Sequence, residues 1–159
     1  MHLSEKNLDF HGIPLVDPQN LEVRDGKIGQ SLFWVGAEIP AGRRIVPFSG
    51  HIVRFDDIPE EMIRYVVRYD MHHYIVPASI AMYANHSCDP NCLINDEFCI
   101  ENIKPLKPGD EITISYDQVS REDLQKWGDF WDPRWSFACS CGAKNCVKYL
   151  AGYRMLSSS

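Results

Sequence analysis

The sequence predicts a mainly β domain of the α+β class, and three observations support this prediction. Short apolar runs rich in β-branched and aromatic residues recur along the chain, glycine and proline interrupt them, and helical periodicity is confined to brief stretches. With 159 residues, of which 45% are hydrophobic and 24% charged, the chain is most simply one globular domain with a modest core.

The first half of the chain contains three strands and one helix in this prediction. Residues 21–25, 31–35 and 43–48 are strand-like, and glycine and proline separate them. From residue 57 to residue 69 the apolar side chains recur with a period of about 3.6 residues, which predicts a helix. The acidic residues at the start of that segment suit the positive end of a helix dipole.

The second half alternates further strands with turns. Residues 74–77 and 80–83 are short, strand-like apolar runs. The pattern around Asn95 and Asp96 predicts a hairpin whose strands cover residues 92–95 and 97–103. Residues 111–116, EITISY, are strongly β-prone. Ser120 followed by Asp123 is typical of a helix cap, which predicts a short helix over residues 121–127.

Charge and terminal composition limit the classes of partner. The formal charge of −6 argues against binding nucleic acid through its phosphates, which requires a basic face. An acidic surface suits a basic partner such as a Lys/Arg-rich peptide, although mild acidity also serves solubility alone. No apolar run approaches a membrane span, and the N-terminal residues lack a signal-peptide core, so an intracellular protein is expected.

Six cysteines are present, and their spacing favours a metal over disulfides. Cys139, Cys141 and Cys146 form C-x-C-x4-C, in which neighbouring thiols pair poorly with each other but can share one ion. Zinc takes four ligands in a tetrahedron, and thiolates suit it. The spacing does not decide which of the remaining three cysteines, Cys88, Cys92 or Cys99, is the fourth ligand. The alternative is that these residues are small buried hydrophobes.

A polar run, Asn85-His86-Ser87-Cys88, follows apolar residues directly. Side chains of this kind either hold a polar ligand or satisfy the backbone of an irregular turn. Taken alone, the second interpretation is favoured. A β-prone strand that ends in Tyr116 and the terminal cysteine cluster shift the balance toward a ligand site.

Several segments together resemble the SET-domain protein lysine methyltransferases. NHSCDPNC resembles the signature of that family, GDEITISYD its following strand with the catalytic tyrosine, and CSCGAKNC its post-SET zinc segment. KIGQSLFW is similar to its Gly-x-Gly cofactor loop, and FSG to the short motif after the next strand. The resemblance runs from about residue 21 to residue 150, although no cysteine cluster of the pre-SET type precedes Cys88.

The resemblance implies a fold and a division of the chain. The fold is the β-clip, a set of small curled sheets with a C-terminal pseudoknot, short helices and a zinc-binding tail. Residues 1–20 would be an N-terminal extension and residues 21–118 the SET domain, with a short substrate-groove insert at 51–84. Residues 119–150 would form the post-SET zinc segment, and residues 151–159 a tail.

The resemblance also implies site residues. Tyr116 would be catalytic, at the channel where the methyl group of S-adenosylmethionine meets the substrate amine. Phe33 and Trp34 are alternatively core aromatics, and for Phe33 the core position is favoured. Tyr149 either lies near adenine or packs against Trp135. The implied contacts are, for the cofactor, Gly29, Ser31, Leu32, Phe33, Trp34, Asn85, His86, Tyr116 and Tyr149; for the substrate channel, Phe48, Ile94 and Ile114; and for zinc, Cys88, Cys139, Cys141 and Cys146.

The sequence departs from the family pattern at the cofactor loop and the channel. Ser31 replaces the second glycine of the loop, and Phe48 stands where many relatives have tyrosine. The channel aromatic that limits methyl number is absent, since Ile114 and Ile94 are aliphatic. A channel without extra hydroxyls holds no ordered water beside the amine, so di- or trimethylation is expected.

The implied activity is methyl transfer to lysine in a basic protein tail, with histone as the first candidate and a nuclear or cytoplasmic location. A peptide would bind extended, at a strand edge. His72 and His73 are either metal ligands or groove residues. The alternative function is a catalytically inactive SET-like module that binds a basic peptide, and both Ser31 and the unusual residues VKYL after Cys146 support it. A third interpretation, a purely structural zinc protein, leaves the polar run and Tyr116 unexplained.

Overall fold

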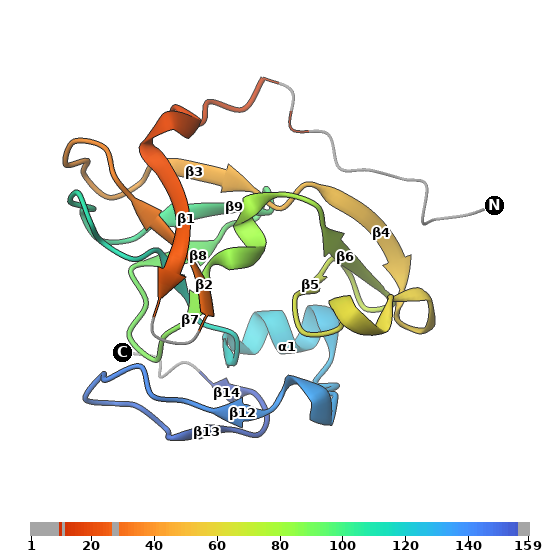
Figure 1. Ribbon diagram of the computed structural model, residues 1–159. Coiled ribbons are helices and arrows are strands. Elements are labelled where there is room, and N and C mark those ends of the chain that lie inside the picture. The colour runs from red at the N-terminus through yellow and green to blue at the C-terminus, as the bar shows by residue number, and fades with distance from the viewer. Residues whose placement is uncertain (1–9, 11, 27–28, 156–159) are drawn as a thin grey trace.

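The computed structural model describes residues 10, 12–26 and 29–155, which form several small sheets around one core (Figure 1). Residues 1–9 and 11 of the expected N-terminal extension, the two loop residues Lys27 and Ile28, and the end of the expected tail at 156–159 lie outside the described residues. The elements in chain order are η2 Pro18–Asn20, β1 Leu21–Gly26, β2 Gly29–Trp34, β3 Arg44–Pro47, β4 Gly50–Arg54, η3 Phe55–Asp57, η4 Glu60–Met62, β5 Val67–Arg68, β6 His73–Pro77, η5 Ile80–Tyr83, β7 Asn85–His86, β8 Cys92–Ile94, β9 Cys99–Asn102, β10 Thr113–Ile114, β11 Gln118–Val119, α1 Arg121–Trp127, η6 Pro133–Trp135, β12 Phe137–Ala138, β13 Tyr149–Leu150 and β14 Arg154–Met155.

The predicted mainly β class is confirmed, and the first strands lie where the sequence placed them. β1 and β2 form an antiparallel hairpin, and β3 pairs with β9 in the sheet β3-β9-β8. The predicted hairpin of β8 and β9 is also confirmed. Its turn is held by Asn95, whose side-chain oxygen accepts hydrogen bonds from the amides of Glu97 and Cys99. Phe98 completes the turn with φ of 61°.

The helix predicted over residues 57–69 is wrong. The segment contains two short 3₁₀ turns, η3 and η4, and then strand β5, which pairs with β6 in the sheet β4-β6-β5. Pro59 precedes η4 and has no amide hydrogen for a helix, and the β-branched Val66 and Val67 favour extended backbone. Ile63 is buried although the helix is absent. The apolar spacing therefore reported burial correctly but not the backbone conformation.

Two other expectations need correction. Residues 80–83 form the 3₁₀ turn η5 in place of a strand, because the Ser79 hydroxyl accepts a hydrogen bond from the Ala81 amide and starts the turn. The strand expected over residues 111–116 is regular only at β10, which runs parallel to β7. This pairing brings the polar run at Asn85 beside the segment that leads to Tyr116.

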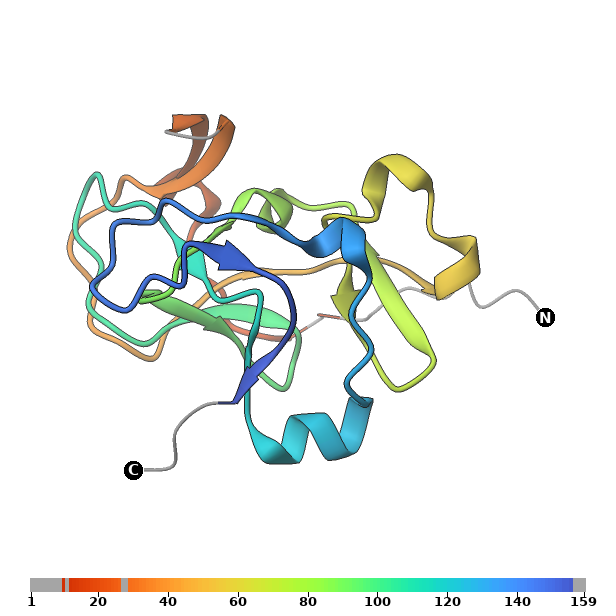
Figure 2. The ribbon, with the colours of Figure 1, turned by 90° about the horizontal axis from the view of Figure 1, so that it is seen from below.

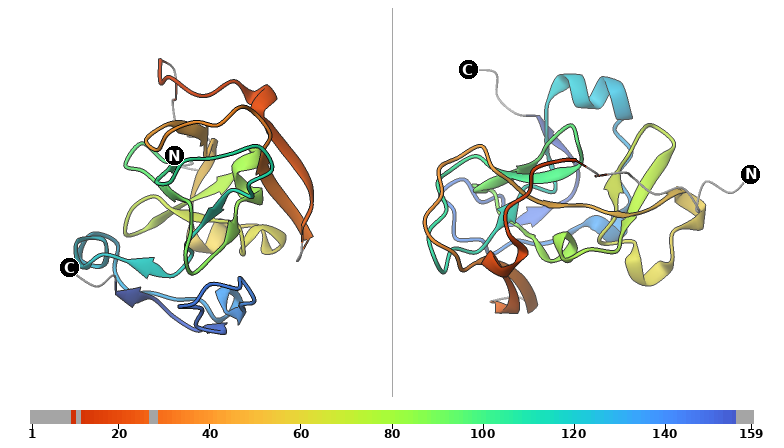
Figure 3. Two further views of the ribbon diagram at one scale, coloured as in Figure 1. Left: turned by 90° about the vertical axis from the view of Figure 1, so that its left-hand side faces the viewer. Right: turned by 90° about the horizontal axis from the view of Figure 1, so that it is seen from above.

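The C-terminal segment forms a layer on one side of these sheets, and this arrangement is visible in Figures 1, 2 and 3. Helix α1 occupies the predicted residues, and the Ser120 hydroxyl caps it by accepting from the amide of Asp123. β12 and β13 pair with each other, and β14 returns to pair in parallel with β11. The layer is attached to the sheets through Trp135, whose ring contacts Phe55 and Tyr74.

The core lies between the hairpin β1–β2 and the sheet β3-β9-β8. Its fully buried side chains each contribute roughly 1.5–3 kcal/mol by leaving water. The largest of these are Leu32, Trp34, Ile45, Ile100, Leu106 and Ile112. This core fixes the ends of β2, β7 and β10, from which the site is built.

Candidate functional site

Tyr116 is held at both its backbone and its side chain. Its amide nitrogen donates a hydrogen bond to Nδ1 of His86 across 3.0 Å, and its hydroxyl donates to the backbone oxygen of Ala84 across 2.7 Å. The residue is 36% exposed, and this surface borders a cavity. Burial of the hydroxyl nevertheless raises the pKa of the phenol well above its ordinary value. Tyr116 is therefore a neutral phenol at physiological pH.

His86 is a buried connector and not a free base. Since Nδ1 accepts from the Tyr116 amide, the neutral ring carries its proton on Nε2, which lies 3.4 Å from Sγ of Cys88. Burial lowers the pKa of His86, and the nearby Asp117 opposes this only in part. The ring thus uses both nitrogens inside the protein. It fixes Tyr116 relative to Cys88.

Asn85 ties the expected cofactor loop to β7. Its side-chain nitrogen donates to the Ser31 hydroxyl across 2.7 Å and lies 3.3 Å from the backbone oxygen of Gln30. Ser31 is fully buried, and its side chain points back across the hairpin, where a Cβ on Gly26 would approach the Ser31 hydroxyl to 2.2 Å. The serine that replaces the family glycine is therefore accommodated by Gly26. It does not line the cavity.

The rest of the loop divides between the cavity and the core. Gly29 lines the cavity, whereas Leu32 and Trp34 are core residues with 0% and 1% exposure. Phe33 lies under the guanidinium of Arg24, with 4.1 Å between that group and the ring centroid. The core position that the sequence left open for both aromatics is observed for Trp34, whereas Phe33, for which it was favoured, is only half-buried.

A cavity of about 910 Å³ joins these groups. Phe48, Ile94 and Ile114, the expected channel residues, all line it together with Tyr116. Tyr65 lines it as well and lies close enough to Tyr116 to affect the phenol's pKa. Sequence reasoning missed Tyr65, because a helix was expected there and no motif marked it.

Four thiols come together beside the cavity. The sulfur atoms of Cys88, Cys139, Cys141 and Cys146 lie within 4.8 Å of one another. Zinc–sulfur bonds of about 2.3 Å in a tetrahedron require sulfur–sulfur distances of about 3.8 Å, and Sγ of Cys88 is 3.9 Å from Sγ of Cys139. A disulfide would need about 2.05 Å. The donor set and its spacing therefore fit one zinc ion.

The cluster is also organised by backbone and amide contacts. Burial raises the pKa of Cys141, but amide hydrogen bonds from Cys88 and Ala143 outweigh it and lower the pKa to about 6. The side-chain amides of Gln118 and Asn145 both donate to the backbone oxygen of Cys88, each across 2.9 Å. The thiolate required by a metal is thus favoured at Cys141, and Cys88 is held from two segments.

The remaining cysteines belong to the interior. Cys92 and Cys99 are both fully buried away from the cluster, and burial raises the pKa of Cys92 to about 12. They are the small buried hydrophobes of the alternative interpretation. Among the three candidates for the fourth ligand, the structure brings only Cys88 to the C-terminal thiols.

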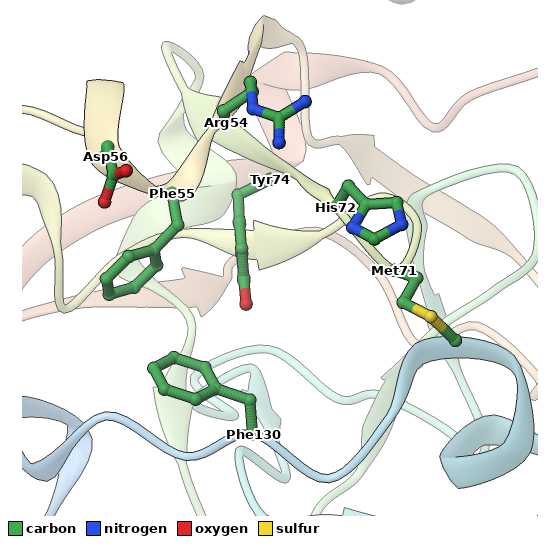
Figure 4. A pocket seen from close by; sticks show the side chains of 7 residues that line it. All are labelled: Arg54, Phe55, Asp56, Met71, His72, Tyr74 and Phe130. Carbon is green, nitrogen blue, oxygen red and sulfur yellow. The ribbon is translucent and has the colours of Figure 1, made fainter.

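Tyr149 and the two histidines lie apart from this arrangement. Tyr149 is 56% exposed on β13, outside the lining of the large cavity, and the aromatic contacts of Trp135 are with other rings. His73 pairs with Asp70 through Nδ1 at 2.8 Å. His72 borders a smaller pocket of about 290 Å³ whose rings, Phe55, Tyr74 and Phe130, face one another in Figure 4.

The charge of the large cavity differs from that of the whole chain. Its lining includes the cations Arg64, Arg68 and Lys126 and the carboxylates Asp96 and Asp123. The excess of negative charge therefore lies on the rest of the surface, so any preference for a basic partner comes from the field of the whole molecule.

Comparison with known proteins places this geometry in a family. Residues 34–117, more than half of the chain, match the model of the SET domain. Histone-lysine N-methyltransferase Set2 of Drosophila melanogaster is 27% identical over 72% of this chain. Methyltransferase flvH of Aspergillus flavus is 31% identical over 49% of it. The chain spans 5% and 40% of the lengths of these two relatives.

A solved structure extends the likeness beyond residue 117. The crystal structure of KRYPTONITE in complex with mCHH DNA, an H3(1-15) peptide and SAH superposes with a TM-score of 0.60 at 27% identity. The superposition covers 94% of this chain and 31% of that chain. The similarity therefore includes the C-terminal layer with the four cysteines as well as the matched SET segment. In the part of the chain that the structure describes, no helix is long and apolar enough to span a membrane.

Proposed function

The chain belongs to the SET-domain family of lysine methyltransferases, and from this premise we propose that it methylates the side-chain amine of a lysine in a basic protein tail. The methyl donor would be S-adenosylmethionine. Relatives named as histone-lysine N-methyltransferases make a histone tail the first candidate substrate and the nucleus the first candidate location. Each of these relatives is far longer than this chain, so the substrate is part of the proposal.

One observation carries the proposal, namely that the three expected functional segments meet at one cavity. The lining includes Gly29 from the hairpin, Asn85 and His86 from β7, and Tyr116 after β10. Segments this far apart in sequence are brought together only by the fold. A structural zinc protein alone would not require a neutral phenol and an amide-held loop around one hollow space.

The residues of this chain would act mainly by positioning. A lysine amine with a reference pKa near 10.4 must lose its proton, which costs about 4–5 kcal/mol at pH 7. Phe48, Ile94 and Ile114 give the channel apolar walls, which disfavour the ammonium form and so reduce that cost. The Tyr116 oxygen, fixed through Ala84 and His86, would hold the amine or the methyl group in line. The bound cofactor would supply the electrophilic methyl group.

Asn85, His86 and Gly29 would hold this cofactor from the protein side. Because both ring nitrogens of His86 already have partners, its contribution would come from its backbone and from the position it gives to Tyr116. Asn85 would act by fixing the backbone of residues 29–31 against β7. Zinc at the four cysteines would keep the C-terminal layer beside the cavity, with Cys88 as the link between them.

The peptide would bind in extended form along the groove next to the channel. β5 is an edge strand of its sheet, and its residues Val67 and Arg68 line the cavity. An extended chain can add backbone hydrogen bonds to such an edge. The aliphatic Ile94 and Ile114 leave room for a methylated amine, which supports di- or trimethylation as the product.

A methyl-transfer assay tests this proposal. The full chain loaded with zinc should transfer labelled methyl from S-adenosylmethionine to core histones or to proteins of a lysate. Tyr116→Phe should lower the rate by about 100-fold or more, since the hydroxyl acts directly at the reacting groups. Tyr69→Phe is the matched control, because Tyr69 does not line the cavity and the substitution keeps the ring that stacks on Phe98.

The alternative, an inactive module that binds a basic peptide, gives a different result. Such a module would still bind S-adenosylhomocysteine in calorimetry but would transfer nothing to any protein. Ser31 favours this alternative in the sequence, but its side chain is fully buried and does not line the cavity. Binding of S-adenosylhomocysteine without transfer to histones or lysate would contradict the proposed activity and favour the module.

A further inference from the structure

Asp117, the residue after Tyr116, is a buried carboxylate with one cationic partner. It is 0% exposed, and Arg154 from β14 binds it with two nitrogens, Nε to Oδ2 across 2.6 Å and Nη2 to Oδ1 across 3.0 Å. The geometry is the paired fork that guanidinium forms with carboxylate. The Arg154 side chain is 30% exposed, so solvent reaches the ion pair from the Arg154 side and not from the Asp117 side.

The same two residues are joined through the backbone. The amide of Arg154 donates to the backbone oxygen of Asp117 across 2.7 Å, where β14 begins its parallel pairing with β11. The Ser115 hydroxyl donates to Oδ1 of Asp117 and accepts from the amide of Gln118. Ser115, Asp117 and Gln118 are thus joined by hydrogen bonds on both sides of Tyr116. Among the described residues, Arg154 is the one cation that binds this group.

Tyr116 lies in the middle of this set but takes no direct part in it. Its own hydrogen bonds are with Ala84 and His86, and its ring packs against His86 and, edge-on, against Phe137 of β12. Two groups of contacts therefore hold the loop, one from β7 and one from β14. A buried carboxylate without its partner must take up a proton or move toward water, and because Asp117 directly follows Tyr116 in the chain, such a movement would disturb the backbone of Tyr116.

We propose that Arg154 is a positioning residue for Tyr116, acting through Asp117, so that the C-terminal strand is a working part of the site. This inference rests on the proposed methyl transfer. It concerns a residue outside the matched SET segment, which ends at residue 117. Arg154 is not one of the four clustered cysteines, but its guanidinium lies close enough to Cys88 to interact with that thiol, so the zinc content is measured in every variant. The sequence placed Arg154 in a tail with no expected role.

The position of the neighbouring residue agrees with this role. Tyr153 lines the large cavity, packs edge-on against Trp131 at 5.1 Å between centroids and lies beneath the guanidinium of Arg68. Arg68 belongs to β5, at the proposed groove. Residues 153 and 154 therefore connect the groove, the wall of the cavity and the loop of Tyr116.

The test compares Arg154→Ala and Arg154→Lys with a control variant, Arg44→Ala. The control breaks the exposed ion pair that Arg44 of β3 forms with Glu97. Arg154→Ala should lower kcat roughly 10- to 100-fold, as expected for a misplaced reacting group, while KM for the cofactor and the zinc content stay near wild type. Lysine should recover part of the loss, because it replaces the fork with a single contact. Arg44→Ala should match wild type.

A second substitution isolates the path through Asp117. Arg154→Ala leaves the carboxylate without its cation, and adding Asp117→Asn removes that charge while keeping the shape. The double variant should therefore regain much of the kcat lost by Arg154→Ala. A double variant as slow as Arg154→Ala would overturn the role of Asp117. A higher kcat/KM for peptide in Arg154→Ala would overturn the proposal too, since the strand would then obstruct the groove.

Amide hydrogen exchange measured by NMR gives a readout that needs no turnover. Exchange at the Tyr116 amide should accelerate in Arg154→Ala by at least about 10-fold, because its bond to His86 opens locally. The Cys139 amide, bonded to the backbone oxygen of Lys148, should stay protected. A selective effect at Tyr116 in a chain that transfers no methyl would reject the proposed function but keep the positioning. Unchanged exchange at Tyr116 would overturn the positioning whatever the activity.

Discussion

The amide nitrogen of Tyr116 donates to Nδ1 of His86 across 3.0 Å, while Nε2 of the same ring lies 3.4 Å from Sγ of Cys88. One buried imidazole therefore joins the tyrosine of the cavity to the thiol cluster. The polar run of the sequence is explained by this geometry: Asn85 faces the loop of β2, His86 faces Tyr116, and Cys88 faces the C-terminal thiols.

Removing the imidazole should separate these parts. His86→Ala leaves the Tyr116 amide without its acceptor and opens space in the interior, so the free energy of unfolding should fall by about 1–3 kcal/mol from the lost hydrogen bond alone. Thermal unfolding measures this as a midpoint lowered by several degrees. His51→Ala on the exposed face of β4 is the control. Equal midpoints for the two variants would show that the contacts of His86 do not stabilise the fold.

The four thiols should hold one zinc ion per chain. X-ray absorption should show four sulfur ligands at about 2.3 Å, and Cys139→Ser should lower both the zinc content and methyl transfer. Cys99→Ala is the control, because Cys99 is buried away from the cluster and should leave the zinc content unchanged. Full zinc content in Cys139→Ser, or a shell with nitrogen or oxygen ligands in wild type, would refute this assignment.

Ser31 should matter for stability more than for the cofactor. Ser31→Ala removes the hydroxyl that accepts from Asn85, and the free energy of unfolding should fall by about 1 kcal/mol. Because the side chain does not line the cavity, the affinity for S-adenosylhomocysteine should change little in calorimetry. Asn85→Ala should weaken that affinity more, since it releases the loop. The reverse order of the two effects would place Ser31 at the cofactor.

Tyr65 should influence the number of methyl groups added. Its phenol lies near Tyr116 at the cavity, so the expectation of a channel without extra hydroxyls is wrong, and a water molecule bound to this phenol would occupy space that a methylated amine needs. Wild type should reach at least dimethyl-lysine, and Tyr65→Phe should shift the product further toward trimethyl-lysine. Mass spectrometry with excess enzyme reads the distribution, with Tyr69→Phe as the control. Product that stops at monomethyl-lysine in both Tyr65→Phe and wild type would contradict this account of the channel.

Local patterns predicted the elements whose conformation is decided locally. The cap at Ser120 predicted the bounds of α1, and Asn95 predicted the β8–β9 turn. Each of these side chains accepts a hydrogen bond from a backbone amide only two or three residues further along the chain. The thiol spacing likewise gave three of the four cluster members. The mainly β class followed from the same local signals.

Features set by distant contacts were not predictable in the same way. Val67 became part of a strand because β6 lies beside it, a tertiary contact that overrides the helical spacing around it. Tyr65 and Arg154 enter the site through the packing of their segments and carry no motif. The choice of Cys88 over Cys92 and Cys99 rested on resemblance until the structure placed the sulfur atoms together.

Tandem mass spectrometry of proteins incubated with the zinc-loaded chain and S-adenosylmethionine tests the central claim most directly, because it identifies the residue that receives the methyl group. Methyl groups should map to lysine side chains in basic segments after incubation with wild type and should be lost with Tyr116→Phe. Methylation confined to other residue types, or lysine methylation that persists at the wild-type level in Tyr116→Phe, would contradict a lysine site built around Tyr116.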